Sequence, residues 1–564
     1  MLSKLLASLY LSEFLGIQSP QVDLPDLPNE VWLQILNHLS SVDLGRSITW
    51  VSHRFHDLAQ PTLLRGLTLH PYSISTGTSE APVLLYPLGV DEKLARLEAR
   101  SAAGPAAYVQ TCTVTSITEI SERDGWDGRD GPAADVYNAL LIPFFTRFLP
   151  RFAALRQLEL CELDLTREVL VGLATVAELE LLTVIRCRMG REGGGIDDPQ
   201  ALWHTIRART VKLLSTTPDD AAELTLIHFL SPETIDVLTF PRYGAGTDAV
   251  LRALPSPGFG HLRKLTLETS TVPFCQITRT ARSFPGLTTL RVIVSQVGLP
   301  ENSDHTLPQL RHLFLEVSEP ISAADTIFEI HRYTGIEVME VKTRPDSWQM
   351  DALASDIAQR PYSDLPALHS FTGPLHTAHS FVSQPNLTHL TTYWPDANTA
   401  LGLIKLLPVA SNLTFVELGL WTVDLEVLVA VFERCPMLET LRIHVSTRWV
   451  YHESKASWPA TLFRSLADGV SSLAPPPTLK NLAISIEYMN VPFASYIDPM
   501  NRRDLDRFRD QLRERCSGLQ VLFCDGYESL YQWTAQPDRV QWFDRAHPGN
   551  ESAGGYQFVC FEAS

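Results

Sequence analysis

The chain has 564 residues, of which 45% are apolar and 20% are charged. That apolar content supports large cores and excludes a disordered or fibrous chain, and the length allows about three to four domains or one elongated array. Acidic residues outnumber basic ones by 64 to 46, so the formal net charge is −18. This balance argues against a nucleic-acid partner, because phosphate binding needs clustered positive charge.

Residues 1–22 predict an amphipathic helix rather than a secretory signal, because serines and Glu13 interrupt the apolar stretch. No later segment reaches the roughly 18 to 20 uninterrupted apolar residues of a membrane-spanning helix. Eight cysteines without close pairs indicate reduced thiols rather than a disulfide framework. We therefore expect a soluble protein of the cytoplasm and/or nucleus with no membrane partner.

Residues 23–66 predict three short helices. Pro28 suits the first turn of a helix, and Val31 and Ile35 share one apolar stripe along it. A second helix follows, and a third is expected to end before Pro61. Three helices in about 40 residues bury too little surface to be robust alone, so we expect a partner to complete the module.

This segment resembles the F-box, the motif that docks onto the Skp adaptor of cullin-RING ubiquitin ligases. The resemblance is carried by Leu27, Pro28, Glu30, Val31, Ile35, Leu39, Asp43, Leu44, Val51, Ser52 and Phe55. It implies adaptor contacts from Leu27, Pro28, Val31, Ile35, Leu36, Leu39, Leu44, Val51 and Phe55. Gly45 departs from the pattern inside the expected second helix, and His53 stands where the family often has a basic residue. The alternative is an ordinary three-helix cap on the segment that follows.

One phrase, apolar-x-x-apolar-x-apolar, recurs along the rest of the chain. Clear phrases form two runs, and within each run they open 23 to 26 residues apart, within the period of leucine-rich repeats. The first run opens at Leu262, Leu287, Leu310 and Ile336, and the second at Leu387, Leu413 and Leu438. Weaker ones open at Leu155, Leu179, Ala208, Ile235, Leu368, Leu479 and Leu519. Several have a proline two residues before the first apolar position, as in Pro285, Pro308, Pro366, Pro385, Pro436 and Pro477.

A proline at that position separates an outer helix from the next inner strand, because it cannot continue a helix. Between phrases the apolar period becomes helical, most clearly over 425–432 and in a helix expected to follow a cap at Asp504. These repeats resemble leucine-rich repeats, although their usual Asn or Cys is mostly absent. We predict an α/β fold in which an irregular solenoid of about a dozen repeats, with parallel inner strands and outer helices, spans 151–530. The alternative is a doubly wound α/β domain.

The remaining segments have weaker patterns. Residues 67–150 predict divergent first repeats, with a helix over 91–101, a strand near Val109 and an acidic, glycine-rich loop at 122–131. Residues 531–564 predict a cap or tail.

No group of residues in the sequence predicts a catalytic, cofactor or metal site. The aspartates at 124, 127 and 130 lack calcium-loop spacing, and the glycines at 193–195 lack the remainder of a phosphate loop. His376 and His379 have no further ligand nearby. Cys435 and Cys516 precede strands and are expected to pack in the core. We therefore expect a protein that is not an enzyme.

The polar positions of each phrase should line the concave face of the solenoid, where a target protein would bind. The candidate residues are Arg263, Lys264, Arg291, Arg311, His312, Glu340, His389, Glu439, Arg442 and Lys480. Further candidates are Thr288, Glu337 and Asn481. Their mixed charges favour a protein partner over a polyanion. Several C-terminal tryptophans, Trp533 and Trp542 among them, are predicted to be buried more often than to anchor an interface.

Together these features predict the substrate-recognition subunit of an SCF-type cullin-RING ubiquitin ligase, in which the F-box binds the Skp adaptor and the array binds a target protein. One alternative is an adaptor-bound scaffold without a role in ubiquitin transfer. Another is an enzyme whose site is assembled from scattered loops.

Overall fold

The fold is described from a computed structural model. It describes residues 29–37, 53–69, 73–75, 83–85, 90–115, 139–177, 179–189, 202–214, 226–240, 254, 258–268, 274–294, 307, 309–317, 333–343, 365–393, 397–408, 411–420, 425–446, 458–487, 502–526 and 529–544. Contacts divide the chain into two units, one of residues 1–182 and 192–197 and one of residues 183–191 and 198–564. Each unit is described by itself.

The first unit combines short helices with parallel strands. Its helices are α2 (Asn29–Asn37), α4 (His53–Leu64), α5 (Val90–Arg100), α6 (Ala103–Ala106), η2 (Phe144–Phe148), η3 (Leu149–Arg151) and α9 (Arg167–Ala174). Its strands are β1 (Gly66–Leu69), β2 (Ser73–Ser75), β3 (Val83–Leu85), β4 (Thr111–Thr115), β5 (Gln157–Cys161) and β6 (Asp164–Leu165). Strand β4 pairs in parallel with β1 and with β5. The expected helix over 91–101 and the strand near Val109 are thus confirmed as α5 and β4.

The second unit is a long series of strands. The boundary passes through β7 (Leu179–Ile185), and β8 (Arg188–Met189) follows. The later strands are β9 (Ala208–Leu214), β10 (Val237–Phe240), β11 (Lys264–Glu268), β12 (Thr289–Val294), β13 (His312–Val317), β14 (Val338–Thr343), β15 (Ser370–Pro374), β16 (His389–Tyr393), β17 (Phe415–Leu420), β18 (Thr440–Ser446), β19 (Asn481–Glu487), β20 (Val521–Asp525), β21 (Ser529–Ala535) and β22 (Asp538–Asp544). The helices are α12 (Phe274–Ala281), α15 (Leu375–Ala378), α16 (Ala397–Leu406), α17 (Leu425–Arg434), α18 (Trp458–Gly469), η5 (Val470–Ser472) and α19 (Arg502–Arg515).

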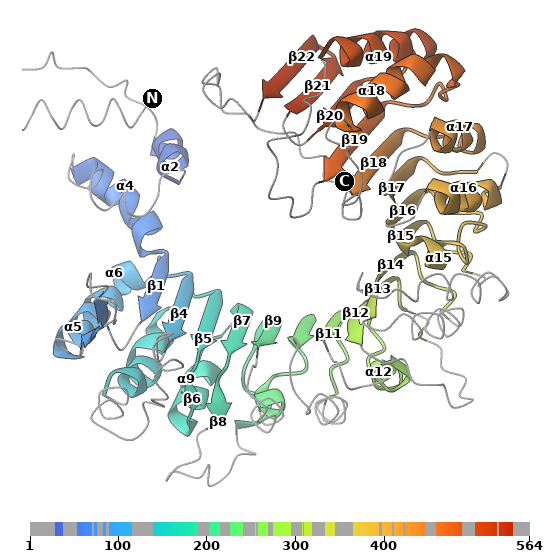
Figure 1. The fold of residues 1–564 in the computed structure, drawn as a ribbon. Coiled ribbons are helices and arrows are strands. Elements are labelled where there is room, and N and C mark those ends of the chain that lie inside the picture. Colours follow the sequence, from blue (N-terminus) through green and yellow to red (C-terminus); the bar gives the residue numbers. More distant parts are fainter. Residues whose placement is uncertain are drawn as a thin grey trace, which may run out of the picture. The chain divides into compact units, whose positions relative to one another are not determined.

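Strands β9 to β20 pair in parallel, each with its neighbours in the sequence. The labelled helices of this unit lie along one face of the sheet (Figure 1). A doubly wound fold would place helices on both faces and reverse the strand order, so that alternative is wrong. The predicted phrases coincide with these strands, and most open two residues before the strand begins.

The apolar positions of the phrases explain the parallel register. The fourth phrase position of neighbouring repeats is aligned, as in Leu265, Leu290 and Leu313, and each of these side chains is fully buried. Burying one whole face in this way fixes the register, because a slip of one residue would turn every leucine to the opposite face.

Along much of the parallel sheet, the residue before a strand joins neighbouring repeats through its carbonyl group. The carbonyl oxygen of Arg263 accepts hydrogen bonds from the N–H groups of Thr288 and Thr289, both at 2.9 Å. The carbonyl of Glu439 likewise accepts from Lys480 and Asn481. We call this arrangement the carbonyl fork. It recurs in the first unit, where the carbonyl of Arg65 accepts from two residues at the start of β4.

A second row of contacts joins the Pro-x-Leu turns. The Asn386 side chain donates to the carbonyl oxygen of Pro366 at 2.6 Å, and Asn412 donates to that of Pro385 at 2.9 Å. Thr478 donates to the carbonyl oxygen of Pro436 at 3.1 Å. The residue after the turn proline, or at the equivalent position, can therefore satisfy a backbone acceptor of the preceding repeat.

The last two strands end the sheet differently from the sequence prediction. Strand β21 pairs antiparallel with β20 and with β22. Tyr531 and Trp533 of β21 are fully buried, which confirms the predicted burial of Trp533. The Tyr531 hydroxyl donates to Asp506 at 2.9 Å, and the Trp533 indole N–H donates to Asp538 at 2.7 Å. The predicted cap at 531–564 thus begins within a hairpin that extends the sheet.

Two helix boundaries predicted from the sequence are wrong. Helix α4 continues through Pro61 to Leu64, because a proline already has a helical φ and one missing N–H does not end a helix whose neighbours are packed. Helix α19 begins at Arg502, so Asp504 lies in its first turn and is not its cap. There its carboxylate lies 3.6 Å from Arg464 and 3.5 Å from Arg507. The predicted N-terminal helix, the second helix of the F-box-like segment and the loop at 122–131 lie outside the described residues.

Candidate interaction surfaces

Helices α2 and α4 form the described part of the N-terminal module. Leu36 and Ala59 are buried between them, at 1% and 0% exposure. The Trp32 and Phe55 rings meet edge to face with their centroids 4.9 Å apart. Arg54 donates two hydrogen bonds to the Asn29 side chain, at 2.9 and 3.2 Å, and so joins the start of α2 to α4.

The structure describes only some of the predicted adaptor-binding residues, and those that it describes differ in exposure. Leu36 already uses its apolar surface within the helix pair, whereas Ile35 and Phe55 are half-buried and remain partly accessible. Val31 lies on α2, but its side chain is outside the described set. Leu27, Pro28, Leu39, Leu44 and Val51 are also outside the described residues. Their adaptor contacts stay predictions.

The second surface is the strand face opposite the buried leucines in the second unit, which we call the open face. Six of the predicted target-binding residues lie within strands on this face: Lys264, Arg291, His312, Glu340, His389 and Arg442. The register aligns Arg291 with Phe314 and Glu340 on the next two strands. The alternation of apolar and polar residues in the sequence therefore predicted the correct face of the sheet for these six residues.

The other four predicted residues, Arg263, Arg311, Glu439 and Lys480, directly precede strands. They occupy the row of the carbonyl fork. Lys480 lies 2.9 Å from the Glu439 carboxylate, and Arg311 lies 3.6 Å from Glu337. These pairs are partly exposed, so each contributes about 1 kcal/mol or less. This row marks the edge of the open face rather than its centre.

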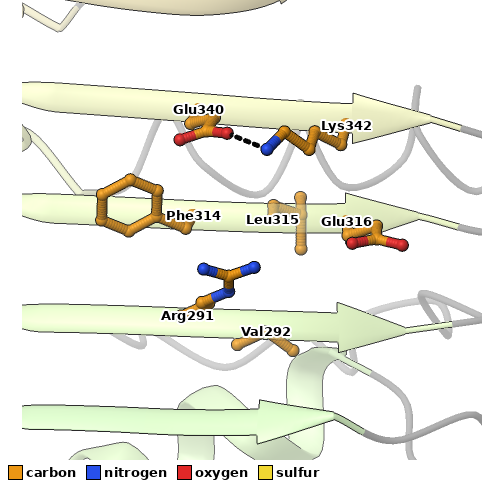
Figure 2. A pocket seen from close by; sticks show the side chains of 7 residues that line it. All are labelled: Arg291, Val292, Phe314, Leu315, Glu316, Glu340 and Lys342. Atoms are coloured by element: carbon orange, nitrogen blue, oxygen red, sulfur yellow. Dashed lines mark ion pairs between the residues drawn. The ribbon is translucent and has the colours of Figure 1, made fainter. Parts of the chain in front are cut away.

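A shallow depression crosses the open face from β12 to β14. Arg291, Phe314 and Glu340 line it on three successive strands, and Lys342 forms an ion pair with Glu340 at 2.6 Å (Figure 2). The half-buried Phe314 ring lies near the Arg291 side chain in this view. An aromatic ring between charged groups is a feature of protein-binding surfaces.

A polar and aromatic cluster occupies the open face from β16 to β18. The His389 and Phe415 rings are stacked with centroids 5.6 Å apart, and the Arg442 guanidinium lies 5.3 Å from the centre of the Phe415 ring. Arg442 is also 3.7 Å from the Glu417 carboxylate, and His444 Nε2 is 3.2 Å from it. We call these five residues the aromatic–charge cluster.

The balance of charge at Glu417 keeps its carboxylate ionised. Burial raises the pKa of Glu417, but the hydrogen bond from His444 and the positive charges of His444 and Arg442 outweigh it, so the net pKa lies below its usual value. His389 behaves oppositely, because burial and the nearby His369 lower its pKa and favour the neutral ring. The cluster therefore holds a fixed negative charge beside a neutral stacked imidazole.

His444 also contacts the Ser485 hydroxyl through Nδ1, which gives the order carboxylate, imidazole, hydroxyl across β17, β18 and β19. Hydrolases use that order of groups together with free N–H donors that stabilise an oxyanion. Here the N–H groups of these inner strands are used in the parallel ladder. These three strands therefore lack the free N–H donors that such a site uses.

The cysteines and metal ligands give no sign of a reactive centre among the described residues. Cys435 and Cys516 are fully buried, as predicted, and burial raises the pKa of Cys435 to about 11. Such thiols remain protonated and unreactive at neutral pH. No group of three metal-ligating side chains, and no helix able to span a membrane, occurs in the described part of the chain.

Sequence analysis missed several residues of the open face. Phe314 and Phe415 were not selected, because only polar residues were taken as candidates, and Glu417 was passed over although it is a polar position of its phrase. His444 lies beyond the end of the six-residue phrase altogether. The signal that could have found Glu417 and Phe314 is their place between two buried positions of the phrase, which alternation assigns to the open face.

Comparison with known proteins supports the resemblance of the N-terminal segment to the F-box. Residues 24–70 match the F-box-like family. No curated protein matches the chain. Among solved structures, the mouse RP105/MD-1 complex matches with a TM-score of 0.35 and 12% identity, covering 74% of this chain. The chain spans 59% of the length of that solved chain. This protein therefore carries an F-box-like domain at residues 24–70, followed in the sequence by a repeat-like array of parallel strands.

Proposed function

We propose that this protein is a substrate-recognition subunit of an SCF-type cullin-RING ubiquitin ligase. The observation that carries the proposal is the F-box-like match at 24–70, within which α2 and α4 pack against each other through Leu36 and Ala59. The F-box-like domain binds a Skp adaptor, and the partly accessible Ile35 and Phe55 contribute to that contact. This role places the protein in the cytoplasm and/or nucleus.

The parallel array is proposed to be an irregular leucine-rich-repeat solenoid whose open face binds the target protein. Support comes from the aromatic–charge cluster and from the depression around Phe314, because aromatic and arginine side chains dominate the binding energy of many protein interfaces. The chain itself supplies no catalytic group. It raises the effective concentration of target lysines near an enzyme carried by other subunits.

Co-purification with a Skp adaptor tests the first part of this proposal. The wild-type chain should retain the adaptor, and Val31→Asp or Leu27→Asp should abolish retention by placing a charge in an apolar contact. Gln34→Asp is the matched control, because Gln34 is exposed on the same helix. Retention that is unchanged in both Leu27→Asp and Val31→Asp would show that the docking assignment is wrong.

Ubiquitin transfer separates a ligase receptor from a scaffold. A receptor should promote ubiquitination and proteasome-dependent turnover of the protein bound to its array, and the Val31→Asp variant should not. A scaffold would retain both the adaptor and the bound protein without any change in the turnover of that protein.

A further inference from the structure

The open face of β9 to β12 carries a concentration of positive charge that contrasts with the net charge of the chain. Lys212, Lys264 and Arg291 project from three of these strands, and Arg263 precedes β11. All four side chains are exposed. We call them the basic patch. Within the described residues none of the four has an ion-pair partner, whereas the chain as a whole has a formal charge of −18.

The strand register brings Lys212, Lys264 and Arg291 onto two adjoining rows. One row reads Lys212, Thr239, Thr266, Arg291 across four successive strands. The row beside it reads Thr210, Val237, Lys264, Thr289. Thr266 is buried, whereas Thr210, Thr239 and Thr289 are half-buried. The patch therefore combines separated positive charges with partly accessible hydroxyl groups, which can hydrogen-bond to carboxylates.

Nearby carboxylates do not neutralise the patch. Asp236 is held by Arg209, with 2.7 Å between Arg209 Nε and the carboxylate. Glu340, which lines the same depression as Arg291, is held by Lys342 at 2.6 Å. In the aromatic–charge cluster, by contrast, Arg442 lies 3.7 Å from the Glu417 carboxylate. The cations of the basic patch are therefore available to bind a partner.

We propose that the basic patch binds an extended, Asp/Glu-rich segment of the target protein, lying across the strands. This inference rests on the proposed role of the open face in target binding. Adjacent strands are about 4.8 Å apart, so Lys212 and Arg291 are separated by roughly 14 Å. Alternate side chains of an extended peptide repeat every ~6.8 Å, so acidic residues at i and i+4 match that separation.

The limits of the patch favour an acidic peptide over a nucleic acid. Beyond Arg291 the row continues with Phe314 and Glu340, and Glu316 lies beside it. Lys342 is already paired with Glu340, so a phosphate backbone that continued across the sheet would meet carboxylates and a neutralised cation. Phe314 lies at the same boundary. A peptide can follow its acidic residues with an apolar one at this point, whereas a nucleic acid repeats its charge at every nucleotide.

Fluorescence anisotropy with the full chain bound to its adaptor tests this inference. The probe is a labelled peptide of about eight residues with glutamate at alternate positions, which spans roughly 26 Å when extended. A peptide with glutamine in place of each glutamate is the matched probe. We expect the glutamate peptide to bind, the glutamine peptide to bind at least about tenfold more weakly, and added salt to weaken the difference.

Variants then locate the site. The combined Lys212→Glu, Lys264→Glu and Arg291→Glu variant should weaken binding by about tenfold or more, and Arg291→Gln alone by roughly threefold. Lys405→Glu, on the exposed surface of helix α16, should leave binding unchanged. The single Arg291→Gln variant keeps the test decisive if the triple variant does not fold.

Three results would overturn the inference: equal binding of the two peptides, unchanged binding by Arg291→Gln in a folded protein, or tighter binding of a single-stranded oligonucleotide than of the glutamate peptide. Adaptor retention measured on the same samples reports the proposed ligase role separately. A variant that retains the adaptor but loses the peptide affects only the open face.

Discussion

His444 Nε2 on β18 lies 3.2 Å from a carboxylate oxygen of Glu417 on the neighbouring strand, and its other ring nitrogen contacts Ser485 on the strand beyond. One imidazole therefore joins three repeats whose sequence positions are far apart. Arg442 provides a second positive group beside the same carboxylate. These contacts make the stability of this part of the array sensitive to the ionisation of Glu417.

The first prediction concerns acid stability. Burial opposes ionisation of Glu417, but His444 and Arg442 lower its net pKa below the ordinary value of 4.5. A carboxylate with a lowered pKa contributes stability above its ordinary pKa and loses that contribution as the pH falls through its folded-state pKa. Below about pH 5 the melting temperature of the wild type should fall more steeply than that of Glu417→Gln.

Melting curves followed by circular dichroism at a series of pH values check this. Glu439→Gln serves as the control, because that carboxylate is more exposed, at 46%, and its pair with Lys480 is screened by solvent. Parallel acid profiles for the wild type and Glu417→Gln would contradict the assignment.

The second prediction concerns the close approach of two turns. A Cβ atom at Gly518 would lie 2.6 Å from the carbonyl oxygen of Pro477. Gly518→Ala should therefore lower the free energy of unfolding by about 1 to 3 kcal/mol. Gly402→Ala is the control, because nothing lies within 4 Å of its Cβ position in helix α16 and alanine favours a helix by roughly 0.5 to 1 kcal/mol. Urea unfolding should give opposite signs for the two variants.

The third prediction concerns the side chains that join the Pro-x-Leu turns. Asn386→Ala removes the donor to the carbonyl of Pro366 and should cost about 1 kcal/mol of stability. Asn386→Asp should cost more, because a carboxylate cannot donate to that carbonyl. Ser383→Ala, at an exposed site nearby, should change the urea midpoint little. A midpoint for Asn386→Ala equal to that of Ser383→Ala would argue against a stabilising role.

The fourth prediction concerns the C-terminal hairpin. The Tyr531 hydroxyl donates to Asp506 and lies 3.2 Å from Arg509, although the ring itself is fully buried. Tyr531→Phe should destabilise the protein by about 1 to 2 kcal/mol, since it removes one hydrogen bond from each of two charged partners, which keep their bonds to each other and to Asp510. Amide exchange should increase in β21 and β22 before it increases in β17. Equal exchange in all three strands would show that the hairpin does not open separately.

The strands could be predicted because their signal is local. Each phrase contains its own buried leucines, such as Leu438 and Leu441, and the two-residue alternation of a strand shows them directly. The buried packing of Cys435 and Cys516 followed from the same pattern. The hairpin of β21 and β22 was missed because it lacks the phrase and pairs antiparallel.

The contacts of the open face could not be predicted, because they depend on register between distant segments. Glu417 meets Arg442 and His444 only after β17 and β18, which helix α17 separates in the sequence, have paired. Nothing in the separate phrases specifies which polar residues become neighbours. The same holds for the basic patch, whose cations are scattered in the sequence and gathered by four aligned strands.

The carbonyl fork has a mechanical consequence. Each fork ties a repeat to its immediate neighbour, as Arg263 is tied to Thr288 and Thr289, and makes no bond to a repeat further along. Under a pulling force, repeats in the second unit would detach one after another from an end, giving small extensions of similar length instead of one abrupt rupture. At one end the hairpin of β21 and β22 pairs with β20. Repeats at that end would therefore detach only after the hairpin has unfolded.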